Sequence, residues 1–160
     1  MIRTLICALL ATAIVAAPAQ AACWRADEVA AAKVRDFDTL LMVSSLRCRM
    51  QDPAMVARYN AFVTKNRVPL TQANVVLRTR FVALVGKAAA LNAYDRYITK
   101  VANRYGAGAD GLSCADFASL TDAALAEAPS FAALTALAER ASTRPVMDDE
   151  ACAVTLAARR

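Results

Sequence analysis

The sequence contains no histidine, only four glycines and a single tryptophan among its 160 residues. The absence of histidine excludes Ser-His-Asp and Cys-His catalysis, and every metal site that needs an imidazole ligand. Apolar residue types make up 58% of the chain, which excludes a disordered protein. A chain of this length is expected to form one domain. The sequence therefore indicates a small folded protein without histidine-based chemistry.

Residues 1–21 have the organisation of a secretory signal peptide. A positive charge is followed by an apolar stretch of thirteen residues at 5–17, then by Pro18 and by small residues up to a predicted cleavage site after Ala21. A membrane span needs about 20 apolar residues, so a cleaved signal is favoured over an anchor, and no later run is long enough to span a bilayer. We therefore expect residues 22–160 to form a single helical domain that is periplasmic or secreted.

Four cysteines remain once the predicted signal is removed, at separations of 25, 66 and 38 residues. An even number of cysteines in an oxidising compartment predicts two disulfides, whereas a four-thiolate zinc site brings its ligands in closely spaced pairs. Lipidation of Cys23 is disfavoured, because Gln20 stands where lipoprotein signals usually carry leucine. The predicted disulfide cysteines are Cys23, Cys48, Cys114 and Cys152.

Helix geometry excludes one of the three possible disulfide pairings. Residues 27–49 are predicted to form one continuous helix, which separates Cys23 from Cys48 by roughly 35 Å, while a disulfide tolerates about 7 Å between Cα atoms. Two pairings remain. If consecutive helices alternate in direction, Cys114 returns to the end of the bundle that holds Cys23. We therefore predict Cys23–Cys114 and Cys48–Cys152, although Cys152 fits this count only if a late helix breaks the alternation.

Apolar residues recur at intervals of three and four, the spacing typical of amphipathic helices. Residues 75–85 are rich in valine and would also suit a strand, but strand alternation would bury Thr79 or both Arg78 and Arg80, so we predict a helix. The fold class is therefore all-α, a compact bundle of five to seven helices stapled by two disulfides. The predicted helices cover residues 26–50, 53–66, 71–85, 87–105, 114–127 and 131–141, with a short last helix at 148–159.

Capping residues and helix breakers define the predicted helix ends. Val68-Pro69 predicts a turn, and Gly106 is predicted to end a helix in the left-handed conformation. Ser113, followed by Asp116, resembles a capping box. Ser130 is predicted to cap the helix that follows it.

Charge is divided unevenly along the chain. Residues 22–104 hold 14 basic and 6 acidic side chains, whereas residues 105–158 hold 2 basic and 8 acidic ones. This asymmetry favours docking of early helices on late ones, and it also predicts a basic face for an anionic partner such as phospholipid headgroups or acidic glycans. A solvated helix face explains the same charges, and a single tryptophan offers little aromatic anchoring at a membrane. The candidate anion-binding face consists of Arg78, Arg80, Lys87, Arg96, Lys100 and Arg104.

Three patterns resemble functional motifs but have simpler explanations. Residues 106–111 spell G-x-G-x-x-G, yet a dinucleotide site needs an apolar strand immediately before it, and the preceding residues are polar and basic. Acidic residues 148–150 would diverge on a helix, so they suit a solvated turn better than a metal site. Asp36 and Asp38 diverge likewise, so we favour a structural ion pair with Arg35 over a hydrolytic pair. We assign no catalytic, cofactor or metal residue.

Several segments together resemble a group of small exported alphaproteobacterial proteins with four cysteines. The resemblance implies an exported helical protein with disulfides, and it assigns no activity. Some members carry the name S-adenosyl-L-homocysteine hydrolase, which implies a large NAD enzyme that this chain does not match, so no catalytic residue is carried over. The segments are Cys23-Trp24, Val34-Arg35-Asp36-Phe37, Leu41-Met42-Val43, Leu46-Arg47-Cys48 and Asn103-Arg104-Tyr105-Gly106.

The sequence thus predicts a binding or structural module of the cell envelope in preference to an enzyme. Its partner is expected to be an envelope component and not a nucleic acid. One alternative is an envelope hydrolase that uses paired carboxylates, which predicts a cleft with two acidic residues from different helices, one with a raised pKa. The other is a peripheral binder of anionic lipid or glycan through the basic face.

Overall fold

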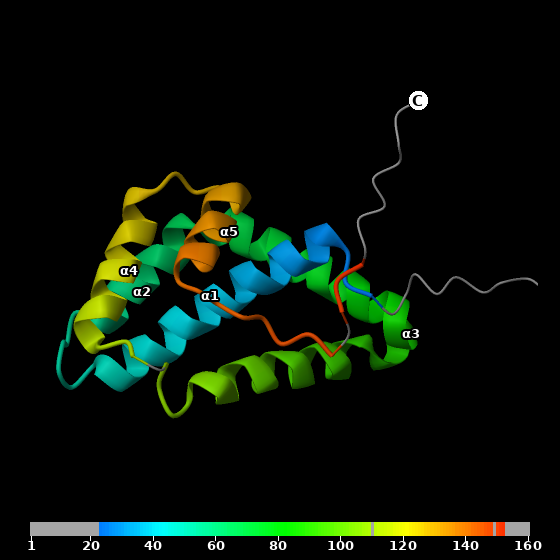
Figure 1. Ribbon diagram of the computed structural model, residues 1–160, viewed down its shortest axis with the longest axis horizontal. Coiled ribbons are helices and arrows are strands. Elements are labelled where there is room, and N and C mark those ends of the chain that lie inside the picture. The colour runs from blue at the N-terminus through cyan, green and yellow to red at the C-terminus, as the bar shows by residue number, and fades with distance from the viewer. Residues whose placement is uncertain (1–22, 110, 149, 153–160) are drawn as a thin grey trace, which may run out of the picture.

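The computed structural model describes residues 23–109, 111–148 and 150–152. Within these ranges the chain forms five α-helices and no strand, which confirms the predicted all-α class. None of the helices in this described part is both long and apolar enough to cross a membrane. The predicted signal and residues 153–159 of the predicted last helix lie outside it. The helices are α1 (Ala26–Cys48), α2 (Met55–Lys65), α3 (Arg67–Tyr105), α4 (Cys114–Ala126) and α5 (Phe131–Arg140) (Figure 1).

Helix α1 is the centre of the bundle, because it contacts each of the other four helices. Phe37 and Leu41, on its apolar stripe, are buried as the spacing predicted. Enclosure on several sides also buries polar side chains, so that Glu28, Asp36 and Asp38 are only 6%, 0% and 3% exposed. A buried carboxylate is costly unless it is paired, so each of these residues needs a partner from the surrounding chain.

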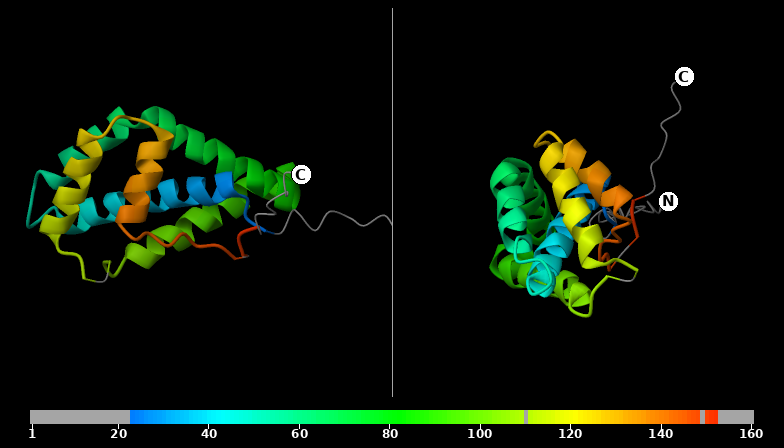
Figure 2. Two further views of the ribbon diagram at one scale, coloured as in Figure 1. Left: turned by 45° about the horizontal axis from the view of Figure 1, so that its top comes forward. Right: turned by 90° about the vertical axis from the view of Figure 1, so that its left-hand side faces the viewer.

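Helix α2 and the first part of α3 follow one another toward the same end of the molecule (Figure 2). Only Asn66 separates them. Its backbone N–H donates to the carbonyl of Phe62, and its own carbonyl accepts from the N–H of Leu70. The turn predicted at Val68-Pro69 is therefore wrong. The proline is tolerated because the first turn of a helix leaves its N–H groups without helical partners.

Helix α3 reverses direction at Gly86, whose φ of 76° and ψ of 161° are accessible essentially to glycine alone. The predicted break at this residue is thus confirmed, and two arms at 67–85 and 87–105 run in opposite directions (Figure 1). We call residues 82–89 the elbow. Gly106, by contrast, has right-handed helical angles of −59° and −36°, so the left-handed cap predicted there is wrong.

Helices α4 and α5 begin with the predicted caps. Ser113 Oγ accepts from the N–H of Asp116, whose carboxylate accepts in return from the N–H of Ser113. Ser130 Oγ accepts from an N–H in the first turn of α5. After α5 the chain runs along the molecule to the end where α1 begins, and Ala151 there forms a single parallel bridge with Trp24 (Figure 1).

Two disulfides join Cys23 to Cys152 and Cys48 to Cys114, with Cα atoms 4.9 and 5.6 Å apart. The predicted pairing of Cys23 with Cys114 and of Cys48 with Cys152 is therefore wrong. Helix alternation fails because α2 and the first arm of α3 make one pass together, so the second arm returns to the end of α1 that carries Cys48 (Figure 1). Residues 150–152 are not helical, contrary to prediction, and they bring Cys152 to the opposite end.

Candidate functional site

A pocket of about 830 Å³ lies between α4, α5, the loop before α4 and the segment after α5. A cavity of this size accommodates a small organic molecule. Leu40 reaches it from α1, and Tyr105 from the end of α3. The complete lining is Leu40, Tyr105, Ala109, Leu112, Asp116, Ser119, Leu120, Arg140, Ala141, Ser142, Thr143 and Arg144.

The pocket has an apolar base and a polar rim. Leu40 and Tyr105 are 2% and 7% exposed and form the base, whereas Arg140, Ser142 and Arg144 are exposed around it. A lining that combines two exposed arginines with buried apolar groups favours a ligand with an apolar body and one anionic group, because guanidinium groups bind carboxylates and phosphates through paired hydrogen bonds.

A buried polar network fixes the base of the pocket. The Tyr105 hydroxyl donates to Oδ2 of Asp36 at 2.9 Å. Arg104 forms an ion pair with Asp36 and also donates to the backbone carbonyl of Arg144. One guanidinium therefore connects α1, the end of α3 and the segment after α5, which are three of the elements around the pocket. Arg104 is thus a positioning residue for the base and the rim.

Burial governs the ionisation of this network. It raises the pKa of Asp36 above the ordinary value of 3.8, against the opposing charge of Arg104. Burial also raises the pKa of Tyr105, and the neighbouring Asp36 carboxylate raises it further. The tyrosine therefore stays protonated at neutral pH and keeps donating to Asp36.

The backbone at the rim has an uncommon conformation. Ser142 has a φ of 54°, in the left-handed region that costs a residue with a Cβ about 1 kcal/mol or more. Its neighbour Thr143 stabilises this bend, since both its N–H and its hydroxyl donate to the carbonyl of Ala138 at 3.0 Å. With the bond from the N–H of Ser142 to the carbonyl of Glu139, these contacts form a left-handed cap that ends α5 and fixes the course of the rim segment.

The other charged groups of the pocket differ in their availability. Asp116 is engaged by Ser113, whose Oγ and N–H donate to its carboxylate at 2.6 and 2.7 Å. These hydrogen bonds lower the pKa of Asp116 below 3.8. Arg140 forms an ion pair with Glu127 at 3.3 Å in which both side chains are about half exposed. Such a pair is worth at most about 1 kcal/mol, so an anionic ligand replaces Glu127 at little cost.

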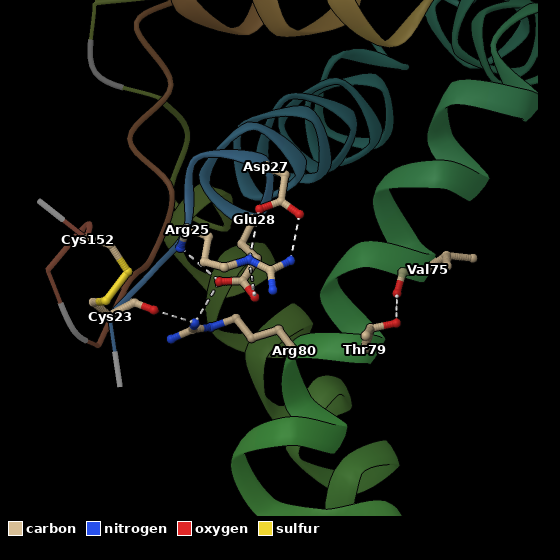
Figure 3. A network of polar contacts seen from close by, with 8 residues as sticks. All are labelled: Cys23, Arg25, Asp27, Glu28, Val75, Thr79, Arg80 and Cys152. Carbon is tan, nitrogen blue, oxygen red and sulfur yellow. Dashed lines mark hydrogen bonds and ion pairs between the residues drawn. A yellow bond between two sulfur atoms is a disulfide. The ribbon is translucent and has the colours of Figure 1, made fainter. Parts of the chain in front are cut away.

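A second polar cluster lies at the other end of α1, beside the Cys23–Cys152 disulfide (Figure 3). Arg80 reaches across from α3 and donates to the Glu28 carboxylate and to the backbone carbonyl of Cys23, each at 2.9 Å. Its guanidinium carbon lies 3.9 Å from the centre of the Trp24 ring. Because Arg80 is only 3% exposed, its guanidinium holds the fold together and is not presented to solvent, whereas Arg25 of the same cluster is exposed and pairs with Asp27.

Asp36 and Asp38 do not face each other. Asp38 forms an ion pair with Arg35 and accepts a hydrogen bond from the hydroxyl of Tyr59 at 3.0 Å. Burial raises the pKa of Asp38 against the charge of Arg35. The predicted structural ion pair is therefore confirmed for Asp38, while Asp36 pairs with Arg104 on the side of the pocket.

The six residues of the predicted anion-binding face do not share one surface. Arg80 is buried against Glu28, so its inclusion was wrong. Arg104 is bound to Asp36 beneath the pocket. The other five residues of the predicted face are exposed, but Arg104 is paired with Asp36, which leaves Arg78, Lys87, Arg96 and Lys100.

Sequence reasoning missed the rim of the pocket. One signal was available, since Arg140 and Arg144 are the only basic residues between positions 105 and 158. Ser142 was missed because serine is not a residue type that marks a left-handed helix cap, although the hydrogen bonds that hold the bend are local. Comparisons with protein-family models, with curated proteins and with solved structures found no match.

Proposed function

We propose that the protein is a ligand-binding module of the cell envelope that takes an amphipathic anion in the pocket between α4 and α5. The presence of Arg140 and Arg144 in the same lining as the buried Leu40 and Tyr105 carries the proposal. The apolar body of the ligand lies against Leu40 and the Tyr105 ring. Its carboxylate or phosphate meets the two guanidinium groups.

Two features support an envelope location. Disulfides such as Cys23–Cys152 and Cys48–Cys114 form and persist in oxidising compartments, and residues 1–21 have the pattern of a secretory signal. The Cys48–Cys114 disulfide also serves the pocket, because it ties the first residue of α4 to the end of α1.

Binding is favoured over hydrolysis by the state of the nearby acidic groups. Asp116 is engaged in the cap of α4. Asp36 is fully buried, with Arg104 and Tyr105 as partners. A hydrolase with two carboxylates needs both groups to reach the substrate, whereas these two serve the protein itself.

Calorimetric titration with dodecanoate, and with dodecanol as its neutral counterpart, tests the proposal. We expect dodecanoate to bind at least about tenfold more tightly, because a hydrogen bond to a charged group is worth about 1.5–3 kcal/mol. The double variant Arg140→Gln/Arg144→Gln should lose this preference. Ser119→Trp, which places a large ring in the pocket, should abolish binding of both probes.

Arg96→Gln is the control for loss of an arginine, since it removes one such charge from an exposed position on the second arm of α3. It should leave the affinity for dodecanoate unchanged. Equal affinity for acid and alcohol in the wild type, or equal losses in Arg96→Gln and the double variant, would contradict an anion site at the rim.

A further inference from the structure

We propose that the elbow of α3 is a docking site for an anionic lipid bilayer. This surface is separate from the ligand pocket: the elbow lies at one end of the long axis of the molecule, and α4 lies toward the other (Figure 1). The inference therefore stands whether or not the pocket binds a ligand.

The elbow exposes an unusual run of side chains. All eight residues from 82 to 89 are exposed, and Lys87 is the only one with a polar side chain. Val82, Leu84 and Val85 are 37%, 37% and 46% exposed, and Leu91 on the second arm is 57% exposed. Exposed apolar side chains that are contiguous, as here, mark an interaction site more often than single ones do.

The segment that forms the elbow carries basic residues and no acidic ones. No acidic residue occurs between positions 53 and 94, a stretch that holds six basic residues. Two of these, Arg78 and Lys87, are exposed near the elbow. Apolar side chains flanked by cations complement a bilayer with anionic headgroups.

A small depression between the arms of α3 adds a place for a headgroup. It has a volume of about 200 Å³ and is lined by Arg78, Val82, Lys87, Ala90 and Leu91. One cation comes from each arm, and the remaining lining is aliphatic. A lipid phosphate would bind between the two cations. The aliphatic side chains of the elbow would then lie among the acyl chains.

The elbow is formed before any partner arrives. Phe81 from the first arm packs on Tyr94 and Tyr97 from the second, with ring centres 6.1 and 5.5 Å apart. Gly86 provides the reversal, and a Cβ at this position would meet nothing within 4 Å. The arms thus present their tip rigidly and without cover, so little conformational entropy is lost on docking.

Vesicle co-sedimentation with the full mature chain tests the proposal. We expect binding to vesicles that contain phosphatidylglycerol, little binding to pure phosphatidylcholine, and release as the salt concentration rises. Lys87→Glu should lower the partition coefficient about tenfold or more, because each cation near an anionic surface contributes about a factor of five to ten. Val85→Asp should lower it by a similar factor. Both residues are exposed, so both variants should fold, as circular dichroism will verify.

Matched controls are available on the same helix. Arg67→Glu makes the same change of net charge as Lys87→Glu, and Val68→Asp repeats the aliphatic-to-acid change at a residue that is 77% exposed. Val68 lies about 27 Å along the helix from Gly86, at 1.5 Å per residue. Both controls should retain vesicle binding within about twofold of the wild type. Arg140→Gln/Arg144→Gln should also retain it, which separates this proposal from the pocket.

Three results would overturn the assignment. Equal binding to neutral and anionic vesicles, or none to either, would remove the anionic bilayer as the partner. Equal losses in Val68→Asp and Val85→Asp would remove the elbow as the site. A wild-type dimer in sedimentation velocity without vesicles, dispersed by Val85→Asp, would assign the elbow to a second copy of this chain instead.

Discussion

Nη1 of Arg80 and Oε2 of Glu28 lie 2.9 Å apart in an ion pair that joins residues 52 positions apart in the sequence. Their side chains are 3% and 8% exposed, so water screens the pair very little. The pair fixes the first turn of α1 to the first arm of α3, next to Trp24 and Cys23. Variants of these two residues therefore test how much the pair contributes to the stability of this end of the bundle.

Replacing Arg80 with methionine removes the buried cation of Glu28 and leaves the carboxylate only the more distant, exposed Arg25, whose Nε lies 3.8 Å away. We expect Arg80→Met to lower the free energy of unfolding by about 3–5 kcal/mol, measured by urea denaturation at neutral pH. Arg78→Met is the control on the same helix, where the exposed side chain predicts a loss below about 1 kcal/mol. Glu28→Gln in the Arg80→Met background should recover part of the loss. Equal losses at positions 78 and 80 would show that the buried pair contributes little.

Asp36 should give stability an unusual dependence on pH. Burial raises its pKa above 3.8 in the folded state, so the folded protein holds this proton more tightly than the unfolded chain. The contribution of Asp36 to stability is then greatest below pH 3.8 and is lost as pH rises through the folded-state pKa. The difference in unfolding free energy between wild type and Asp36→Asn should therefore fall as pH rises.

Asp116 should make stability depend on pH in the opposite direction from Asp36. Its hydrogen bonds with Ser113 lower its pKa below 3.8, so its contribution is present above that pH and is lost as pH falls through the folded-state pKa. The difference in unfolding free energy between wild type and Asp116→Asn should therefore rise with pH. Urea denaturation at a series of pH values measures both differences. If both change with pH in the same direction, burial does not govern the ionisation of Asp36.

Gly86→Ala should disturb the reversal of α3. The observed backbone angles cost a residue with a Cβ about 1–3 kcal/mol, and a straight α3 of 39 residues is the alternative. Straightening sends the second arm onto another copy of the chain, which is domain swapping. Because Cys48 and Cys114 lie on either side of Gly86, the swapped dimer should carry intermolecular disulfides, visible on a non-reducing gel.

Gly106→Ala is the control for this reversal. Gly106 has right-handed helical angles, so the variant should stay monomeric and change the unfolding free energy by less than about 0.5 kcal/mol. Dimerisation of Gly106→Ala, or an unchanged stability and oligomeric state in Gly86→Ala, would contradict the role assigned to the elbow glycine.

Proteolysis without reduction, followed by mass spectrometry, should find the peptide of Cys23 linked to that of Cys152, and the peptide of Cys48 linked to that of Cys114. The Cys48–Cys114 disulfide closes a loop of 66 residues. Its removal in Cys48→Ala/Cys114→Ala should cost roughly 4 kcal/mol, read as a lower midpoint in urea. A Cys23 peptide linked to a Cys114 peptide would contradict the observed disulfides and would support the pairing expected from helix alternation.

Local physics was sufficient for much of the fold. Apolar spacing placed the helices, including the valine-rich 75–85 segment, and the caps at Ser113 and Ser130 were found from their residue types. These features depend on neighbours within four positions, so the sequence displays them directly. The break at Gly86 was visible for the same reason, since glycine ends helices wherever the chain must leave right-handed space.

Tertiary structure decided the direction of the helices and the burial of charged side chains. Whether the chain reversed at Asn66 or passed straight into α3 depended on packing against α1, and that single choice determined which end Cys114 reached. Arg80 and Lys87 look alike in a list of basic residues, yet one is enclosed by Glu28 and Trp24 while the other faces solvent. The pocket likewise depends on segments far apart in sequence, which meet only because burying the apolar faces of all five helices leaves them no other arrangement.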